Sequence, residues 1–199
     1  MNVTIEVEVK TYDELSKATQ VKLLNKEHES LVEMWQPDIV IDEFKEKAAA
    51  VGFLEVEVRY SGFGNQGDGA CFDAKIDVSK VCKHLRIKYE DNTVHCAIIT
   101  IEHRYIHERS RSISCEAHAA VSLEKLEEIQ SKIEELRFDL CITLYRDLAQ
   151  DYDACTSDEE CLQFLRQRRF VNLDTLEVDI IEASNNARGA TNCERIQII

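Results

Sequence analysis

The sequence has little proline and glycine, and it has no long apolar run. One proline and six glycines in 199 residues exclude a collagen-like, low-complexity or linker-rich chain. No stretch reaches the roughly 20 consecutive apolar residues that a membrane-spanning helix needs. The first ten residues alternate apolar and polar side chains, which is not the pattern of a signal sequence. We therefore expect a soluble cytoplasmic protein that docks on no membrane.

Basic residues are also scarce. Lys and Arg number 24 while Asp and Glu number 38, so the net charge is −14. Nucleic-acid-binding proteins gain much of their affinity from basic side chains that neutralise phosphates. This charge balance therefore argues against direct binding of nucleic acid. The apolar fraction of 44% is still enough to form a core.

The eight cysteines are scattered along the chain, and none belongs to a CxxC pair. A zinc site needs Cys and His ligands that converge at short spacings, and the sequence has no such pair of pairs. We therefore predict no metal and no cofactor. Since no secretory signal is present, we also expect all eight cysteines to be reduced.

The hydrophobic pattern predicts an α+β fold. Apolar and polar residues alternate over residues 54–60, 70–76 and 113–119, as in strands with one buried face. A sheet with one apolar and one polar face is covered by helices on one side only. We predict a mostly antiparallel sheet with helices packed on one face. The whole chain, 1–199, is interpreted as a single domain with a frayed C-terminal tail from about residue 184.

A long helix is expected over residues 122–151. Its apolar stripe has near-heptad spacing, which leaves two interpretations open. Packing on the sheet of the same chain is the favoured one, and a coiled-coil homo-oligomer is the alternative. The stripe consists of Leu126, Ile129, Ile133, Leu136, Leu140 and Leu144.

The two alternating segments 54–60 and 70–76 enclose a glycine-rich loop, residues 61–69, and so predict an antiparallel hairpin. The stretch YSGFGNQGDGACF at residues 60–72 resembles the SGFxxQGDGAxF core of a family of small, mostly uncharacterised proteins of tailed bacteriophages. Some members of that family carry an antitoxin label. The resemblance implies a phage origin and an accessory role in the cytoplasm of the host cell, and it names no reaction.

The hairpin loop is the first candidate site. Four glycines let a backbone approach a ligand closely, and successive amides can form an anion nest. The alternative is a rigid turn in which Asp68 and Gln66 bond the loop's own amides. The candidate binding residues in and beside the loop are Arg59, Ser61, Phe63, Gln66, Gly67, Asp68 and Gly69.

The second candidate site is the basic segment, residues 102–111, which holds three Arg, two His and two Glu. Such a basic island in an acidic chain favours a small anion over a polymer. Within a strand, His103, Tyr105 and His107 share one face, and Tyr105 could stack on a base as Phe63 could. The two His lie about 13 Å apart on a strand, too far to share a metal ion. The alternative is a solvated strand end whose charges pair with neighbouring acids.

We expect the hairpin loop and the basic segment to border one pocket, with Arg109 and Arg111 at an exposed turn. The favoured hypothesis is a phage protein that binds and sequesters a small phosphorylated, nucleotide-derived ligand, such as an immune signal of the host. One alternative is a phosphodiesterase-like enzyme with His103 or His107 as general acid or base. Another is an acidic inhibitor of a host nucleic-acid-binding protein. We assign no catalytic residue.

Overall fold

The structure is a computed structural model that describes residues 4–88, 93–101, 106–117, 121–171, 179–181 and 193–197. Its contacts divide the chain into two compact units. Unit 1 contains Met1–Trp35 and Asp153–Ile199, and unit 2 contains Gln36–Tyr152. The predicted α+β fold class is confirmed, because helices and antiparallel sheets build both units. The interpretation as a single domain stays a prediction, since a grouping of contacts does not measure independent folding.

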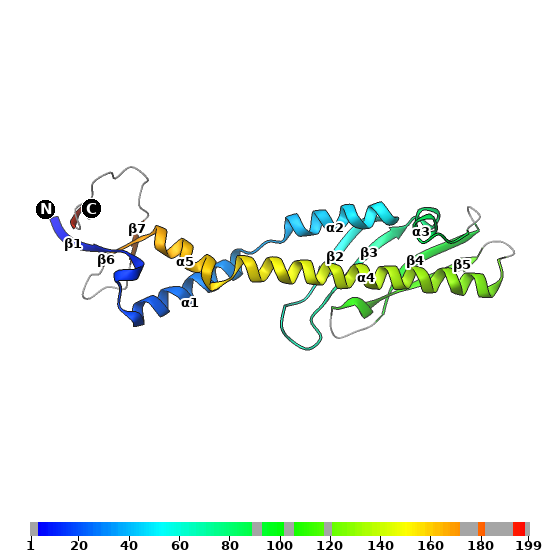
Figure 1. Ribbon diagram of the computed structural model, residues 1–199, viewed down its shortest axis with the longest axis horizontal. Coiled ribbons are helices and arrows are strands. Elements are labelled where there is room, and N and C mark those ends of the chain that lie inside the picture. The colour runs from blue at the N-terminus through cyan, green and yellow to red at the C-terminus, as the bar shows by residue number, and fades with distance from the viewer. Residues whose placement is uncertain are drawn as a thin grey trace. The chain divides into compact units, whose positions relative to one another are not determined.

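Unit 2 holds a four-stranded antiparallel sheet in the order β2-β3-β4-β5 (Figure 1). The hairpin β2–β3 lies where the residue pattern predicts it. None of the helices in the described part of the chain combines the length and hydropathy needed to cross a membrane. The elements of unit 2 are α2 Asp38–Val51, β2 Phe53–Tyr60, β3 Ala70–Ile76, α3 Val78–His84, β4 Val94–Thr100, the short 3-10 helix η2 Glu108–Ser110, β5 Arg111–Ala117 and α4 Leu123–Cys155.

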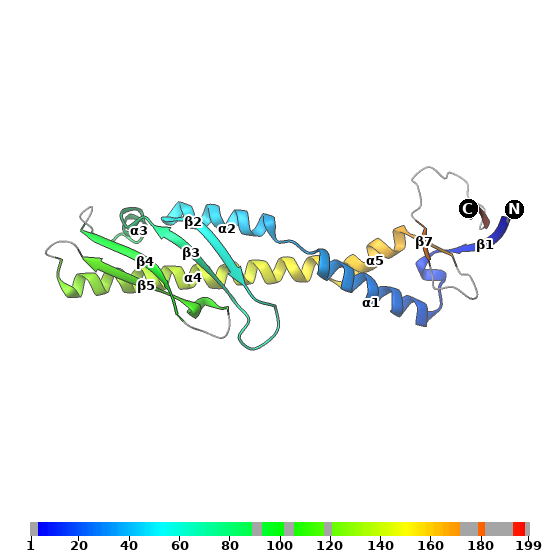
Figure 2. The ribbon, with the colours of Figure 1, turned by 180° about the vertical axis from the view of Figure 1, so that it is seen from behind.

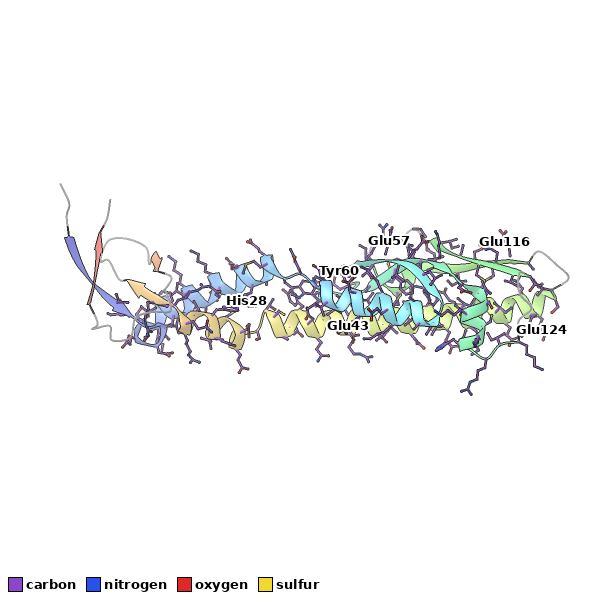
Figure 3. All side chains as sticks on the ribbon, turned by 90° about the horizontal axis from the view of Figure 1, so that it is seen from above. His28, Glu43, Glu57, Tyr60, Glu116 and Glu124 are labelled. Atoms are coloured by element: carbon purple, nitrogen blue, oxygen red, sulfur yellow. A yellow bond between two sulfur atoms is a disulfide. The ribbon has the colours of Figure 1, made fainter. Side chains whose placement is uncertain are left out.

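Helices cover one face of this sheet, as predicted (Figure 2). Phe72 of β3 packs edge-on against Phe44 of α2, with ring centroids 5.3 Å apart. Along β5 the exposure alternates, because Arg111, Ile113 and Cys115 are buried while the two serines between them are partly exposed. Glu57 and Glu116 project from the opposite face, which none of the described helices covers (Figure 3). The alternation of apolar and polar residues therefore reflects one helix-covered face and one open face.

The stripe by which α4 packs differs from the predicted one. Arg137 is fully buried, and its Nη2 donates to Oε1 of Glu134 at 2.6 Å. The other oxygen of Glu134 accepts a hydrogen bond from the backbone N–H of Ile113 in β5, at 2.8 Å. The helix thus packs on the sheet of its own chain, and oligomerisation stays a prediction. The buried positions of α4 are Ile129, Ile133, Arg137, Cys141, Leu144 and Leu148.

The expectation that all cysteines are reduced is wrong for one pair. Cys96 of β4 and Cys115 of β5 form a disulfide, with Cα atoms 4.1 Å apart. The two residues are direct partners in the β4–β5 register, and both side chains are buried. The pairing of β4 with β5 places the two cysteines opposite each other. The spacing of cysteines along the sequence does not reveal how strands pair, so this disulfide could not be predicted from it. Thiols remain at Cys71, Cys82, Cys141, Cys155 and Cys161.

Unit 1 is organised around a small apolar cluster of Tyr12, Leu23, Leu165 and Phe170. Its sheet has the order β7-β6-β1-β8, and all pairings are antiparallel. The tail expected to be frayed contains β8, which pairs with β1, and the expectation of fraying stays a prediction. The other residues of the tail lie outside the described part of the chain. The elements are β1 Thr4–Lys10, the 3-10 helix η1 Tyr12–Glu14, α1 Lys17–Met34, α5 Asp158–Gln167, β6 Arg169–Val171, β7 Asp179–Ile181 and β8 Cys193–Gln197.

Candidate functional site

The hairpin loop and residues 106–111, the described part of the basic segment, lie side by side (Figures 1 and 2). The Ser61 hydroxyl donates a hydrogen bond to the carbonyl of Ile106 at 3.0 Å. A Cβ atom on Gly69 would lie only 2.6 Å from Cβ and 2.8 Å from Cα of His107. Gly69 is therefore required here by the close approach of another backbone. The predicted adjacency of the two segments is confirmed by these contacts, while a pocket between them stays a prediction.

Several polar groups of the loop are bonded within the loop. Ser61 N–H donates to the Gly69 carbonyl at 3.0 Å, and Gly69 N–H donates to the Ser61 hydroxyl at 3.1 Å. Oδ2 of Asp68 accepts the Asn65 N–H at 2.7 Å, as the rigid-turn alternative expects. Gly67 has a φ of 100°, which favours glycine. Ser61, Asp68 and Gly69 therefore build the turn, and within the loop itself Gln66 is the predicted binding residue whose side chain is exposed.

Phe63 anchors the loop to α4. Its ring centroid lies 5.7 Å from that of Tyr145 and 5.0 Å from that of Tyr152. The Tyr145 hydroxyl also donates to the carbonyl of Gly62 at 3.4 Å. Burial raises the pKa of Tyr145, and the nearby charge of Asp68 raises it further. The Phe63 ring, one of the two rings that we expected to stack on a base, is thus packed against tyrosines of the same unit.

Arg111 does not lie at an exposed turn, which corrects our expectation. It begins β5, its side chain is 9% exposed, and it forms a two-pronged ion pair with Asp73. Nε donates to Oδ1 at 2.5 Å and Nη2 donates to Oδ2 at 2.9 Å. This bonding by Arg111 holds the pKa of the Asp73 carboxyl below its usual value. Arg59 reaches the same carboxylate, with Nε 3.3 Å from Oδ2, and is itself 55% exposed.

Arg109 is the most exposed basic group among the described candidates. Its side chain is 75% exposed, and its Nε lies 4.0 Å from a carboxylate oxygen of Glu108. Its backbone N–H donates to Nδ1 of His107 at 3.0 Å, and His107 N–H donates to the Ser110 hydroxyl at 3.0 Å. These bonds fix the η2 turn and use one ring nitrogen of His107.

Two of the predicted residues, His103 and Tyr105, lie outside the described residues. Within the part of the chain that the structure describes, no group of three or more His, Cys, Asp or Glu side chains could hold a metal ion. Sequence reasoning missed Asp73, which the alternation of β3 places among solvent-facing residues. It also missed Tyr145 and Tyr152, whose spacing of two helical turns on α4 was the available signal.

A family model described as a domain of unknown function (DUF8835) matches residues 35–158. The chain belongs to this family. The matched region contains all of unit 2, and therefore both segments of the candidate site. Comparisons with curated proteins and with solved structures find no match. The family match thus gives the bounds of the domain, and it assigns no activity to it.

Proposed function

We propose that the protein is a binding protein that holds a small phosphorylated ligand where the hairpin loop meets the basic segment. The observation that carries the proposal is the contact between the two segments, through Ser61 to Ile106 and through Gly69 to His107. Neither segment offers an anion site alone. Together they bring exposed guanidinium groups and glycine backbone to one region of unit 2.

The residues of the proposed site have two roles. Ser61, Asp68 and Arg111 form the scaffold, because their polar groups are bonded inside the unit. Arg59 and Arg109 face solvent and supply the positive charge for a phosphate. Exposed Gln66 and the backbone at Gly67 supply neutral hydrogen-bonding groups. Charge-assisted bonds from Arg are the stronger kind, so affinity should depend mainly on the two arginines.

Binding without turnover is the favoured mode. Nδ1 of His107 already accepts the Arg109 N–H, so this nitrogen does not serve as a general base. The resemblance of residues 60–72 to phage proteins supports the further proposal that the ligand is a nucleotide-derived immune signal, captured in the cytoplasm of the host cell. Sequestration of such a signal needs tight binding and no chemistry.

The test is calorimetric titration with a panel of cyclic nucleotides, linear nucleotides and ADP-ribose derivatives, with a turnover assay on each ligand that binds. Arg109→Ala should weaken binding about ten- to a hundredfold, because one charge-assisted contact contributes roughly 1.5–3 kcal/mol. The matched control is Arg166→Ala, which removes an exposed guanidinium from α5 in unit 1. Equal affinities of the two variants, or no binding by the wild type, would refute the proposal. Product release would instead favour the enzyme.

A further inference from the structure

A groove lies between β5 and the N-terminal half of α4, apart from the site discussed above. Its volume is about 420 Å³. One wall is β5 and the other is a helix face that combines leucines with carboxylates. The lining includes Ser112 and Ile113 of β5 and Leu123, Leu126, Glu127 and Glu134 of α4. Glu116 and Glu124 mark the end of unit 2 at which this helix begins (Figure 3).

The strand that forms this wall is an edge strand. Among the described strands, in the order β2-β3-β4-β5, β5 has a neighbour on one side only. Backbone groups of an antiparallel strand point alternately toward and away from the neighbour. Ser110 accepts the N–H of Ile101 at 3.1 Å and so faces the β4 side. Ile113 therefore faces the open edge, and its N–H bond to Glu134 at 2.8 Å agrees with this.

Cys115 faces the open edge by the same alternation. No described side chain accepts a hydrogen bond from its N–H, in contrast to Ile113, which is capped by Glu134. The carbonyls of both residues point the same way. An added strand can therefore bond the Cys115 amide directly, and at Ile113 it takes the place of the Glu134 carboxylate, which keeps its ion pair with Arg137. Its disulfide to β4 holds the strand rigid, so pairing requires no ordering of β5.

The helix wall favours a basic occupant. Leu123 is 70% exposed and offers an apolar surface. Glu134 is neutralised by Arg137, whose Nη2 lies 2.6 Å away. Glu127 is exposed, and it forms no ion pair with any residue that the structure describes. A Lys or Arg side chain next to Glu127 would complement this charge. A second copy of the chain fits poorly, because each copy has a net charge of −14.

We propose that this groove binds an extended, basic segment of a partner protein, which adds a strand to the free edge of β5. Main-chain bonds to the edge provide affinity, and alternate side chains that enter the groove provide specificity, as in other cases of strand addition. The lysine or arginine of the segment lies against Glu127, and its apolar neighbour lies against Leu123. This interaction uses residues that the proposed ligand site does not.

The probe is a fluorescein-labelled heptapeptide that alternates valine and threonine around a central lysine. Its binding to the full chain is followed by fluorescence anisotropy, and amide shifts are followed by NMR. We expect saturable binding below about 1 mM and the largest shifts at the amides of β5. The same peptide with a central glutamate should bind at least about fivefold more weakly. Methylation of the central amide nitrogen should weaken binding at least tenfold, because it removes a main-chain donor.

Glu127→Lys should weaken binding of the lysine peptide at least about fivefold. The matched control is Glu128→Lys, which makes the same change of charge at a neighbouring residue that pairs with Lys125 and does not line the groove. Equal binding by the two variants, no effect of amide methylation, or no saturable binding would overturn the proposal. Concentration-dependent shifts at β5 without peptide would identify a second copy as the occupant and would overturn it as well.

Discussion

Exchange of Asp73 for asparagine should destabilise the protein more than exchange of Arg111 for methionine. The two side chains form one ion pair, but they are exposed to different extents, 31% for Asp73 and 9% for Arg111. In Asp73→Asn the buried guanidinium keeps its charge and loses its carboxylate partner. Removing one member of a buried pair costs about 3–5 kcal/mol, and the partial exposure of Asp73 favours the lower end, about 3 kcal/mol.

Replacement of Arg111, the other member of the pair, should cost less unfolding free energy. In Arg111→Met the carboxylate of Asp73 remains in contact with water, and Arg59 stays 3.3 Å from it. Methionine also fills the buried site with an apolar side chain. We therefore expect a loss of about 1–2 kcal/mol, near the value of a hydrogen bond to a charged group. Arg59→Met is the control, because this exposed pair should contribute about 0.2–1 kcal/mol.

Urea denaturation of the wild type and the three variants measures these differences directly. The expected order of destabilisation is Asp73→Asn, then Arg111→Met, then Arg59→Met. If Arg111→Met were as destabilising as Asp73→Asn, the reasoning from unequal burial would be wrong. If both changes cost less than about 0.5 kcal/mol, the ion pair would not contribute to the stability of unit 2.

The same pair makes stability depend on pH. The pKa of Asp73 is lowered in the folded protein, chiefly by its hydrogen bonds from Arg111. Its contribution is therefore complete above the unfolded pKa of about 3.9 and is lost as the pH falls through the lower folded value. Wild type should lose stability more steeply than Asp73→Asn below about pH 4. Parallel stability profiles for the two proteins in acid would contradict this assignment.

Two further predictions concern the hairpin loop and the disulfide. Gly69→Ala should cost roughly 1–3 kcal/mol of unfolding free energy, because the new Cβ would lie 2.8 Å from the backbone of His107. Gly62→Ala, whose nearest contact would be 3.5 Å, should be neutral in the same urea titration, and equal effects would argue against the close approach. Alkylation without reductant, read by mass spectrometry, should leave Cys96 and Cys115 unmodified, and modification of either would disprove the bond. Reduction should cost about 3 kcal/mol, because the disulfide closes a loop with a sequence separation of 19.

Local elements could be predicted from the sequence because each depends on nearby residues. The segment 38–51 ends at Gly52, which adopts the left-handed conformation at the C-cap of α2. The alternation over 70–76 reproduces the bounds of β3. The hairpin between β2 and β3 follows from two such segments around a short glycine-rich loop. Hydrophobic periodicity and turn residues therefore predict most of the secondary-structure elements of unit 2.

Contacts between distant segments could not be predicted in the same way. Cys96 and Cys115 required the register of β4 on β5. Arg111 was expected at an exposed turn because nothing near it in sequence shows that it reaches Asp73, 38 positions away. The stripe of α4 was misassigned at Arg137, because a search for apolar periodicity passes over a charged residue whose partner Glu134 lies one turn earlier.

The candidate site shows why residue types alone did not separate scaffold from binding surface. Serine, aspartate, glycine and arginine are the residues that bind phosphates, and they are also the residues that build tight turns. Ser61 and Asp68 direct their oxygen atoms to amides and carbonyls of unit 2, whereas Arg109 directs its guanidinium into solvent. The distinction lies in the partner that each polar atom has already bonded. Only atoms that can still form hydrogen bonds with a ligand can contribute to its affinity. Arg109 is therefore the first residue to substitute in the binding titration.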